Sequence, residues 1–167
     1  GSRLYEPEYE EKQRFEHEQF LQDILKDGKG KHKGKRIAII GEPGAGKTTL
    51  LRKIAFWVQE NTEYFPISIS LADLQEFTLE DYLLRVWLKT AMKVRQVTRE
   101  MEDALCELFK SERVWLLLDS VDEMPVQGEE PLWAISNHLK GWVAQARVVL
   151  TCRLNVWEAN RNVLADK

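Results

Sequence analysis

The sequence predicts an α/β fold in which a parallel β-sheet carries helices on both faces. Short apolar segments alternate along the chain with segments of helical spacing, an order typical of a parallel sheet covered on both sides. The length of 167 residues suits one domain. Polar residues directly follow the apolar segments. Because ligands of such sheets bind at the carboxyl ends of the strands, we expect the functional site there.

Four strands are expected because four short apolar runs end in polar or turn residues. They span residues 37–40, 65–70, 114–119 and 147–151. The first ends at Gly41, and the third is the densest, with the sequence Val-Trp-Leu-Leu-Leu-Asp. Runs of this kind are typical of parallel strands that are buried on both faces.

The expected helices show apolar residues at helical spacing or a capping residue at their start. They span residues 48–59, 78–93, 98–110 and 131–142, with a short helix around Trp157. Thr78 is followed three residues later by Asp81, which resembles a capping box. Thr98 is expected to open the next helix.

The first 35 residues differ in composition from the rest. Apolar residues recur near helical spacing within the charged segment 4–27, which predicts one amphipathic helix; they are Phe15, Phe20, Leu21, Ile24 and Leu25. Residues 28–35 are rich in Gly and Lys and predict a loop. We interpret it as a solvated connector more readily than as a phosphate or nucleic-acid patch, since no aromatic residues interleave with the lysines. We therefore expect an N-terminal helix and basic linker over residues 1–35 and the α/β core over residues 36–167.

The composition excludes several classes of protein. Hydrophobic residues make up 44% and charged residues 31%, which fits a folded, soluble protein. Lys and Arg total 24 against 27 Asp and Glu, a net charge of −3, so nucleic acid is not an expected partner. Two cysteines make neither a disulfide framework nor a four-cysteine zinc site. No run approaches the length of about 20 apolar residues that a membrane span needs. We expect a cytoplasmic protein with no membrane contact.

The strongest motif is a glycine-rich segment between the first expected strand and the first expected helix. It comprises Gly41, Glu42, Pro43, Gly44, Ala45, Gly46, Lys47, Thr48 and Thr49, and it fits the P-loop pattern G-x-x-x-x-G-K-[ST]. Gly44 and Gly46 let the backbone turn its N–H groups toward phosphate oxygens, and the helix dipole adds to their attraction. Lys47 supplies an ammonium for the β- and γ-phosphates, and the Thr48 hydroxyl ligates Mg²⁺. Thr49 is expected to meet the α-phosphate. The motif predicts a three-layer P-loop NTPase core that binds a nucleotide with Mg²⁺.

A group of acidic residues follows the strand 114–119. Asp119 lies at the carboxyl end of this strand and is expected to hold Mg²⁺ together with Thr48, usually through water. Asp122 and Glu123 come next, and either can orient and deprotonate an attacking water. The sequence leaves their roles open. With Lys47, they are the candidate catalytic residues, and Thr48 and Asp119 are the candidate metal ligands.

The last expected strand runs into Thr151, Cys152 and Arg153. In the branch of the P-loop fold whose catalytic glutamate lies near the metal aspartate, this strand inserts beside the P-loop strand. Thr151 and Arg153 are then expected to face the γ-phosphate and to distinguish triphosphate from diphosphate. Cys152 is expected to be a small buried residue and not a nucleophile, since no histidine lies near it in the sequence.

The motifs resemble those of NACHT domains, within the STAND class of signal-transducing ATPases. The resemblance covers residues from about 36 to 153, and the P-loop with its Glu-Pro and Thr-Thr-Leu-Leu steps is similar to the NACHT form. The family places a small residue after the metal aspartate, then an apolar residue and two acids, as Ser120, Val121, Asp122 and Glu123 do here. Residues 150–153 resemble the family's sensor strand. Proline often follows the sensor arginine, whereas Leu154 stands here.

The resemblance implies an ATP-binding, slowly hydrolysing switch. Such proteins rest in a closed form with ADP, exchange it for ATP as they self-associate, and reset by hydrolysis. The bacterial members, which this chain resembles most, commonly act in defence signalling. The family continues into helical, winged-helix and sensor domains, for which too few residues follow Arg153. We therefore expect this chain to be an excised nucleotide-binding core with low activity on its own. The full-length protein is expected to form homo-oligomers when ATP is bound.

Two other functions stay open. One is a module that holds nucleotide without cleaving it and acts through a protein surface. Many large rings for a small domain suggest it: Trp57, Trp87, Trp133, Trp142 and Trp157. The other is a small-molecule kinase, which needs an arginine-bearing lid; residues 95–99 are the candidate segment. The paired acids favour water as the acceptor. A Ras-like GTPase is disfavoured because the sequence has no Asn-Lys-x-Asp segment, although a preference for ATP over GTP does not follow from the motifs.

Overall fold

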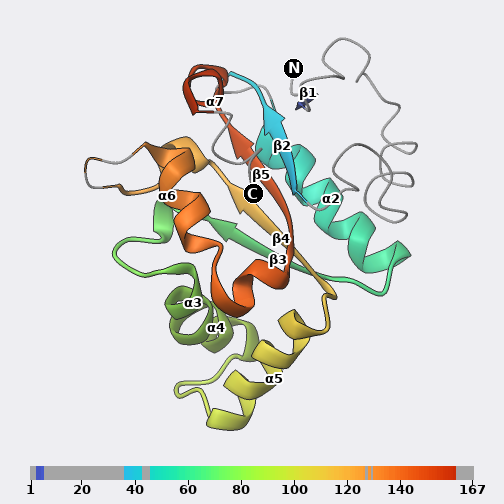
Figure 1. Cartoon of the computed structure of the whole chain (residues 1–167). Coiled ribbons are helices and arrows are strands. Elements are labelled where there is room, and N and C mark those ends of the chain that lie inside the picture. Colours follow the sequence, from blue (N-terminus) through green and yellow to red (C-terminus); the bar gives the residue numbers. More distant parts are fainter. Residues whose placement is uncertain (1–2, 6–35, 43–45, 127, 129, 161–167) are drawn as a thin grey trace.

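The computed structural model describes residues 3–5, 36–42, 46–126, 128 and 130–160 (Figure 1). Its sheet has the strand order β1-β2-β5-β4-β3. Four strands are mutually parallel: β2 (Arg36–Ile40), β3 (Phe65–Ser70), β4 (Val114–Asp119) and β5 (Arg147–Cys152). The parallel α/β class predicted from the sequence is therefore confirmed, with strand bounds within one residue of the expected ones.

The last strand, β5, lies beside β2, as predicted, and its other neighbour is β4. Ile39 of β2 pairs with Thr151 of β5, and Leu118 of β4 pairs with Leu150 of β5. The P-loop strand and the strand that carries Asp119 are thus separated by the width of one strand. This order brings the carboxyl ends of three strands to one edge of the sheet.

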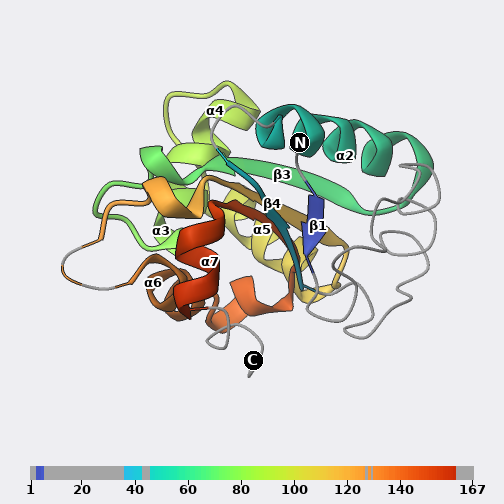
Figure 2. The ribbon, with the colours of Figure 1, turned by 90° about the horizontal axis from the view of Figure 1, so that it is seen from above.

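Alternate residues of the strands face two separate apolar layers, as a parallel sheet in the middle of a domain requires. On one face, α2 (Lys47–Asn61) packs through its buried residues Leu51, Ile54, Trp57 and Val58. The other face meets α3 (Leu79–Tyr82), α4 (Leu88–Met92), α5 (Arg99–Lys110), α6 (Pro131–His138) and α7 (Leu154–Asn160). Figure 2 shows α2 on one side of the sheet and α6 and α7 on the other. The arrangement is the expected three-layer sandwich.

Threonine caps open two of the helices as the sequence predicts. The Thr78 hydroxyl accepts a hydrogen bond from the backbone N–H of Asp81, and the Thr98 hydroxyl accepts one from Met101. The helix expected over residues 78–93 is interrupted: a π-helical turn over Leu83–Trp87 separates α3 from α4. Lys93 then ends α4 in the left-handed conformation, with φ of 55°.

The helix expected over residues 131–142 is shorter than predicted. It ends at His138, and a separate 3₁₀ turn spans Gly141–Gln145. The chain leaves the helical conformation at Leu139, whose ψ is 65°, and Gly141 then has φ of 62°, a value that glycine adopts without strain. The apolar residues beyond this break still pack on the sheet, and this is why the spacing alone suggested one continuous helix.

The N-terminal prediction is wrong at its first residues. Leu4 and Tyr5 were expected to begin a helix, but they lie in β1 (Arg3–Tyr5), which pairs antiparallel with β2. The physical reason is that β1 supplies hydrogen bonds to the outer edge of β2. The rest of the expected helix and the basic linker fall in residues 6–35, outside the described residues, and the division at residue 35 stays a prediction.

None of the described helices combines the length and the apolar composition that a bilayer span requires.

Candidate functional site

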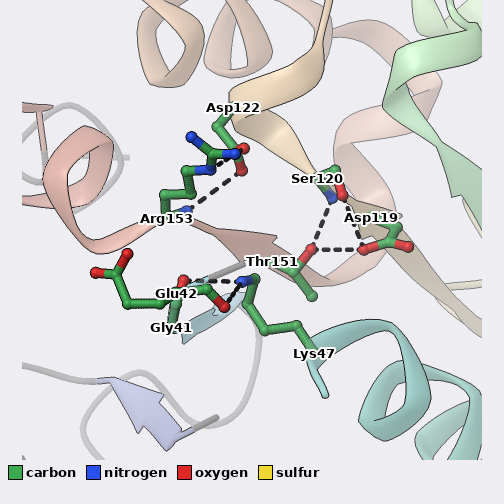
Figure 3. A network of polar contacts seen from close by, with 8 residues as sticks. All are labelled: Gly41, Glu42, Lys47, Asp119, Ser120, Asp122, Thr151 and Arg153. Atoms are coloured by element: carbon green, nitrogen blue, oxygen red, sulfur yellow. Dashed lines mark hydrogen bonds and ion pairs between the residues drawn. The ribbon is translucent and has the colours of Figure 1, made fainter. Parts of the chain in front are cut away.

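The residues singled out in the sequence meet at the carboxyl edge of β2, β5 and β4 (Figure 3). Gly41 follows β2, Asp119 ends β4, and Thr151 and Arg153 lie at the end of β5. The Gly41 N–H donates to the Cys152 carbonyl at 3.2 Å, which ties the start of the P-loop to β5. Pro43, Gly44 and Ala45 lie outside the described residues.

Lys47 lies across the start of the P-loop. Its Nζ donates to the carbonyl oxygens of Gly41 at 2.8 Å and Glu42 at 2.9 Å. The side chain is therefore bent back over the loop, and its ammonium is held near the N-terminus of α2 (Figure 3). Carbonyl oxygens are weaker partners for an ammonium than phosphate oxygens are. The Lys47 ammonium can therefore exchange these two carbonyl oxygens for the oxygens of a phosphate group.

Helix α2 begins with the features of an anion-binding end. Gly46 precedes it with φ of 88°, a value that favours glycine, and accepts a hydrogen bond from Leu50 N–H through its carbonyl. The first turn of α2 carries no acidic residue that would compete with an anion. Thr48 and Thr49 lie in this turn and are exposed. The first turn of α2 thus offers an anion the positive end of the helix dipole with no acidic side chain beside it.

Thr48 and Asp119 are in direct contact, although 71 positions separate them in the sequence. The Thr48 Oγ1 donates to Asp119 Oδ2 at 2.9 Å. The two expected metal ligands therefore lie together, as the sequence analysis required. They present hard oxygen atoms, the type that Mg²⁺ prefers.

Thr151 makes contacts that the sequence analysis missed. Its Oγ1 accepts from the backbone N–H of Ser120 and donates to Asp119 Oδ1, both at 2.7 Å. Thr151 was expected to face a γ-phosphate, but it is fully buried and its hydroxyl is directed at β4. The strand register explains the contact between Thr151 and Asp119. Because Leu118 pairs with Leu150, the next residues, Asp119 and Thr151, lie side by side.

Ser120 occupies a left-handed backbone conformation, with φ of 66°. This conformation turns the chain sharply out of β4 into the 3₁₀ turn Val121–Glu123 that carries the two acids. It costs a non-glycine residue about 1–2 kcal/mol. A glycine at this position would adopt the same conformation without that cost. The Ser120 hydroxyl also donates to Asp119 Oδ1 at 3.3 Å.

We predict that Ser120→Gly leaves the free energy of unfolding within about 1 kcal/mol of wild type, because relief of strain offsets the lost hydroxyl contact. Ser120→Val is expected to lower it by about 2 kcal/mol or more, since a β-branched residue resists positive φ. Urea denaturation followed by circular dichroism measures both. Equal stability of the two variants would contradict the strained turn.

Asp122 and Glu123 have different surroundings. Asp122 accepts from the backbone N–H of Arg153 at 3.3 Å, and its carboxylate lies 3.3 Å from the Arg153 Nε (Figure 3). The Asp122 side chain is only 10% exposed. Glu123 is exposed, and its carboxylate has no hydrogen bond or ion pair with any described residue. The structure thus separates two acids that the sequence left equivalent.

Cys152 is buried beneath the site, as predicted. Burial, with a smaller contribution from the Asp122 charge, raises the pKa of its thiol to about 12. The thiolate is the reactive form, so Cys152 is a poor nucleophile near neutral pH.

This pKa predicts slow alkylation of Cys152. At pH 8 only about one thiol in ten thousand is ionised if the pKa is near 12, and the rate should rise as the pH approaches that value. Iodoacetamide labelling followed by mass spectrometry tests it, and the urea-unfolded chain, in which Cys152 should label readily, is the control. Rapid labelling of Cys152 in the folded protein at pH 8 would be inconsistent with its burial.

A comparison with models of protein families identifies the family of this chain. The model of the NACHT domain matches residues 35–167 of the chain. The chain belongs to the NACHT domain family. Its described part is accordingly a nucleotide-binding module of the P-loop NTPase class, as the resemblance suggested. No curated protein sequence matches the chain significantly.

Proposed function

We propose that this NACHT domain is an ATP-dependent molecular switch that binds ATP or ADP with Mg²⁺ and hydrolyses ATP slowly. The observation that carries the proposal is the 2.9 Å contact between Thr48 of the P-loop and Asp119 of β4. This contact joins the phosphate-binding and metal-binding halves of a P-loop site. Lys47 and the N-terminal end of α2 lie at the same edge of the sheet and add positive charge for a phosphate chain.

The residues present fit a Mg²⁺ ion that is also bound by phosphate and water better than a metal ion bound only by protein side chains. Within the described ranges no three His, Cys, Asp or Glu side chains are grouped to hold a metal ion. Thr48 and Asp119 offer two oxygen ligands, and Mg²⁺ commonly takes one or two protein oxygens, with phosphate and water as the rest. When bound, Mg²⁺ would neutralise charge on the β- and γ-phosphates.

Lys47 and the P-loop would position the phosphates. On nucleotide binding, the Lys47 ammonium would leave the carbonyls of Gly41 and Glu42 for the β- and γ-phosphate oxygens. The P-loop from Gly44 to Thr49 would direct backbone N–H groups at the phosphate chain. Arg153 is a weaker candidate contact, because Asp122 holds its backbone N–H and its guanidinium.

Glu123 is the better candidate for the general base. Its carboxylate is exposed and unpaired among the described residues, whereas the Asp122 carboxylate is taken up by Arg153. A base must be able to accept a proton from water in front of the γ-phosphate. We therefore assign the base to Glu123, and to Asp122 the holding of Arg153 at the end of β5.

The two alternative functions have less support. The segment 95–99, the candidate kinase lid, lies between α4 and α5 at the end of the sheet away from α7, which follows β5 (Figure 1). It is therefore remote from the P-loop edge. Of the tryptophans considered for a binding surface, Trp57 and Trp157 are buried and Trp87 and Trp142 are half-buried, while Trp133 is 47% exposed. The core accounts for most of them.

By its family we further propose a signalling role in the cytoplasm, with self-association of the full-length protein in its ATP-bound state. The free thiols of Cys106 and Cys152 suit a reducing compartment.

A nucleotide titration tests the proposal. ATP, ADP and GTP are titrated into the chain with Mg²⁺ and with EDTA, and phosphate release from ATP is then measured. We expect ATP and ADP to bind, Mg²⁺ to tighten ATP binding, and phosphate release to be slow. Absence of nucleotide binding would refute the function. Binding without phosphate release would favour the non-hydrolysing module.

A further inference from the structure

Thr151 is the one residue of β5 whose side chain bonds both to the backbone after β4 and to the carboxylate of Asp119. Its side chain is fully buried, and both contacts are 2.7 Å long. Figure 3 shows Ser120, Thr151 and Asp119 joined by these contacts. A buried hydroxyl with two short hydrogen bonds has a fixed orientation.

The direction of each hydrogen bond follows from the groups involved. The Ser120 N–H can only donate, so the Thr151 oxygen accepts. The single hydrogen of the Thr151 hydroxyl is then left for Asp119 Oδ1, which as a carboxylate oxygen accepts. One oxygen of Asp119 is thereby committed to Thr151, and the Asp119 side chain is fixed in rotation.

The other oxygen of Asp119 is committed to the P-loop. Oδ2 accepts from the Thr48 hydroxyl at 2.9 Å, so the hydrogen of that hydroxyl faces Asp119 and its lone pairs face away. A threonine oxygen can ligate a divalent cation only through such a lone pair. The rotation of Asp119 therefore determines where the Thr48 oxygen presents its lone pairs.

We propose that Thr151 is a positioning residue for Mg²⁺: by holding Asp119 Oδ1, it aims Asp119 Oδ2 and the Thr48 hydroxyl at the metal site. The proposal rests on the proposed function and extends it to a residue that touches neither metal nor nucleotide. Outer-shell partners of metal-binding groups commonly change metal affinity by about 10–100-fold when they are removed.

The test is the tightening of ATP binding by Mg²⁺, defined as the Kd for ATP in EDTA divided by the Kd in Mg²⁺. It is measured by calorimetric titration for wild type, Thr151→Val, Thr151→Ser and Val149→Ala. Thr151→Val removes the hydroxyl at nearly constant volume, and Thr151→Ser keeps it. Val149→Ala is the matched control, because Val149 is buried on the same strand, packs beneath α2, and has no polar side-chain atom that could hold Asp119. Melting temperatures report any general loss of stability.

We expect Thr151→Val to lower this tightening by about tenfold while the Kd in EDTA changes by less than about twofold. Thr151→Ser should restore it to within about threefold, and Val149→Ala should lower only the melting temperature. If Thr151→Val does not fold, Thr151→Ala gives the same comparison with a smaller side chain.

Three results would overturn the inference. The first is an unchanged tightening in Thr151→Val. The second is an equal loss in Val149→Ala, which would make the effect one of stability. The third is a wild-type protein that binds ATP without any effect of Mg²⁺. A wild-type protein that binds no nucleotide would instead refute the proposed function itself, so the two failures are distinguishable.

Discussion

Replacement of Lys47 by alanine is expected to weaken ATP binding by about 100-fold or more. The ammonium is the one charged side chain that bonds to the described part of the P-loop backbone, at Gly41 and Glu42. Hydrogen bonds to charged groups contribute about 1.5–3 kcal/mol each, and Lys47 would make two of them, to the β- and γ-phosphates. Calorimetric titration of Lys47→Ala with ATP in Mg²⁺ measures the effect.

The matched control is Lys53→Ala. Lys53 lies on the same helix, α2, and is exposed, so its replacement removes the same charge away from the P-loop. We expect its ATP affinity to stay within about threefold of wild type, because an exposed charge at this distance is largely screened by salt. Equal losses in the two variants would mean that Lys47 acts only through net charge.

Replacement of Glu123 by glutamine is expected to lower the rate of phosphate release by about 100-fold or more. General bases contribute about 10²–10⁴-fold to catalysis, and the amide cannot accept the proton. The affinity for ATP should stay within about threefold of wild type, since glutamine keeps the size and polarity of the side chain. Single-turnover phosphate release, at ATP concentrations above the Kd, separates the two quantities.

Asp122→Asn is the control for this assignment. Asp122 already accepts from Arg153 N–H and faces its guanidinium, so we expect its replacement to slow phosphate release by less than about tenfold. A larger loss in Asp122→Asn than in Glu123→Gln would reverse the roles of the two acids.

The strands and the site edge followed from local patterns in the sequence. The dense apolar run before Asp119 predicts a buried strand whichever strands lie beside it in the sheet. The P-loop motif marks both the end of one strand and the start of the following helix. The contact between Thr48 and Asp119 was predictable because the motif implies it. Chemistry that requires particular residue types at particular spacings leaves a pattern that a single sequence can show.

The structure differs from the sequence-based predictions where tertiary contacts determine the local conformation. The break after His138 begins at Leu139, an apolar residue that leaves the helical conformation, and β1 forms because β2 has an edge to pair. The partners of Asp122 and Thr151 depend on the register of β5 against β4, which apolar spacing does not specify. A threonine at a strand end can face a ligand or a neighbouring strand, and only the placed strands show that it meets Asp119.

The most direct test of the account is a crystal structure of the chain with Mg²⁺ and a non-hydrolysable ATP analogue. The account predicts the triphosphate on the P-loop, with Lys47 Nζ at its β- and γ-phosphates. It places the Thr48 Oγ1 about 2.1 Å from Mg²⁺ and Asp119 beside the ion, in direct contact or through one water. A triphosphate bound elsewhere, or a Mg²⁺ ion with neither Thr48 nor Asp119 near it, would contradict the account.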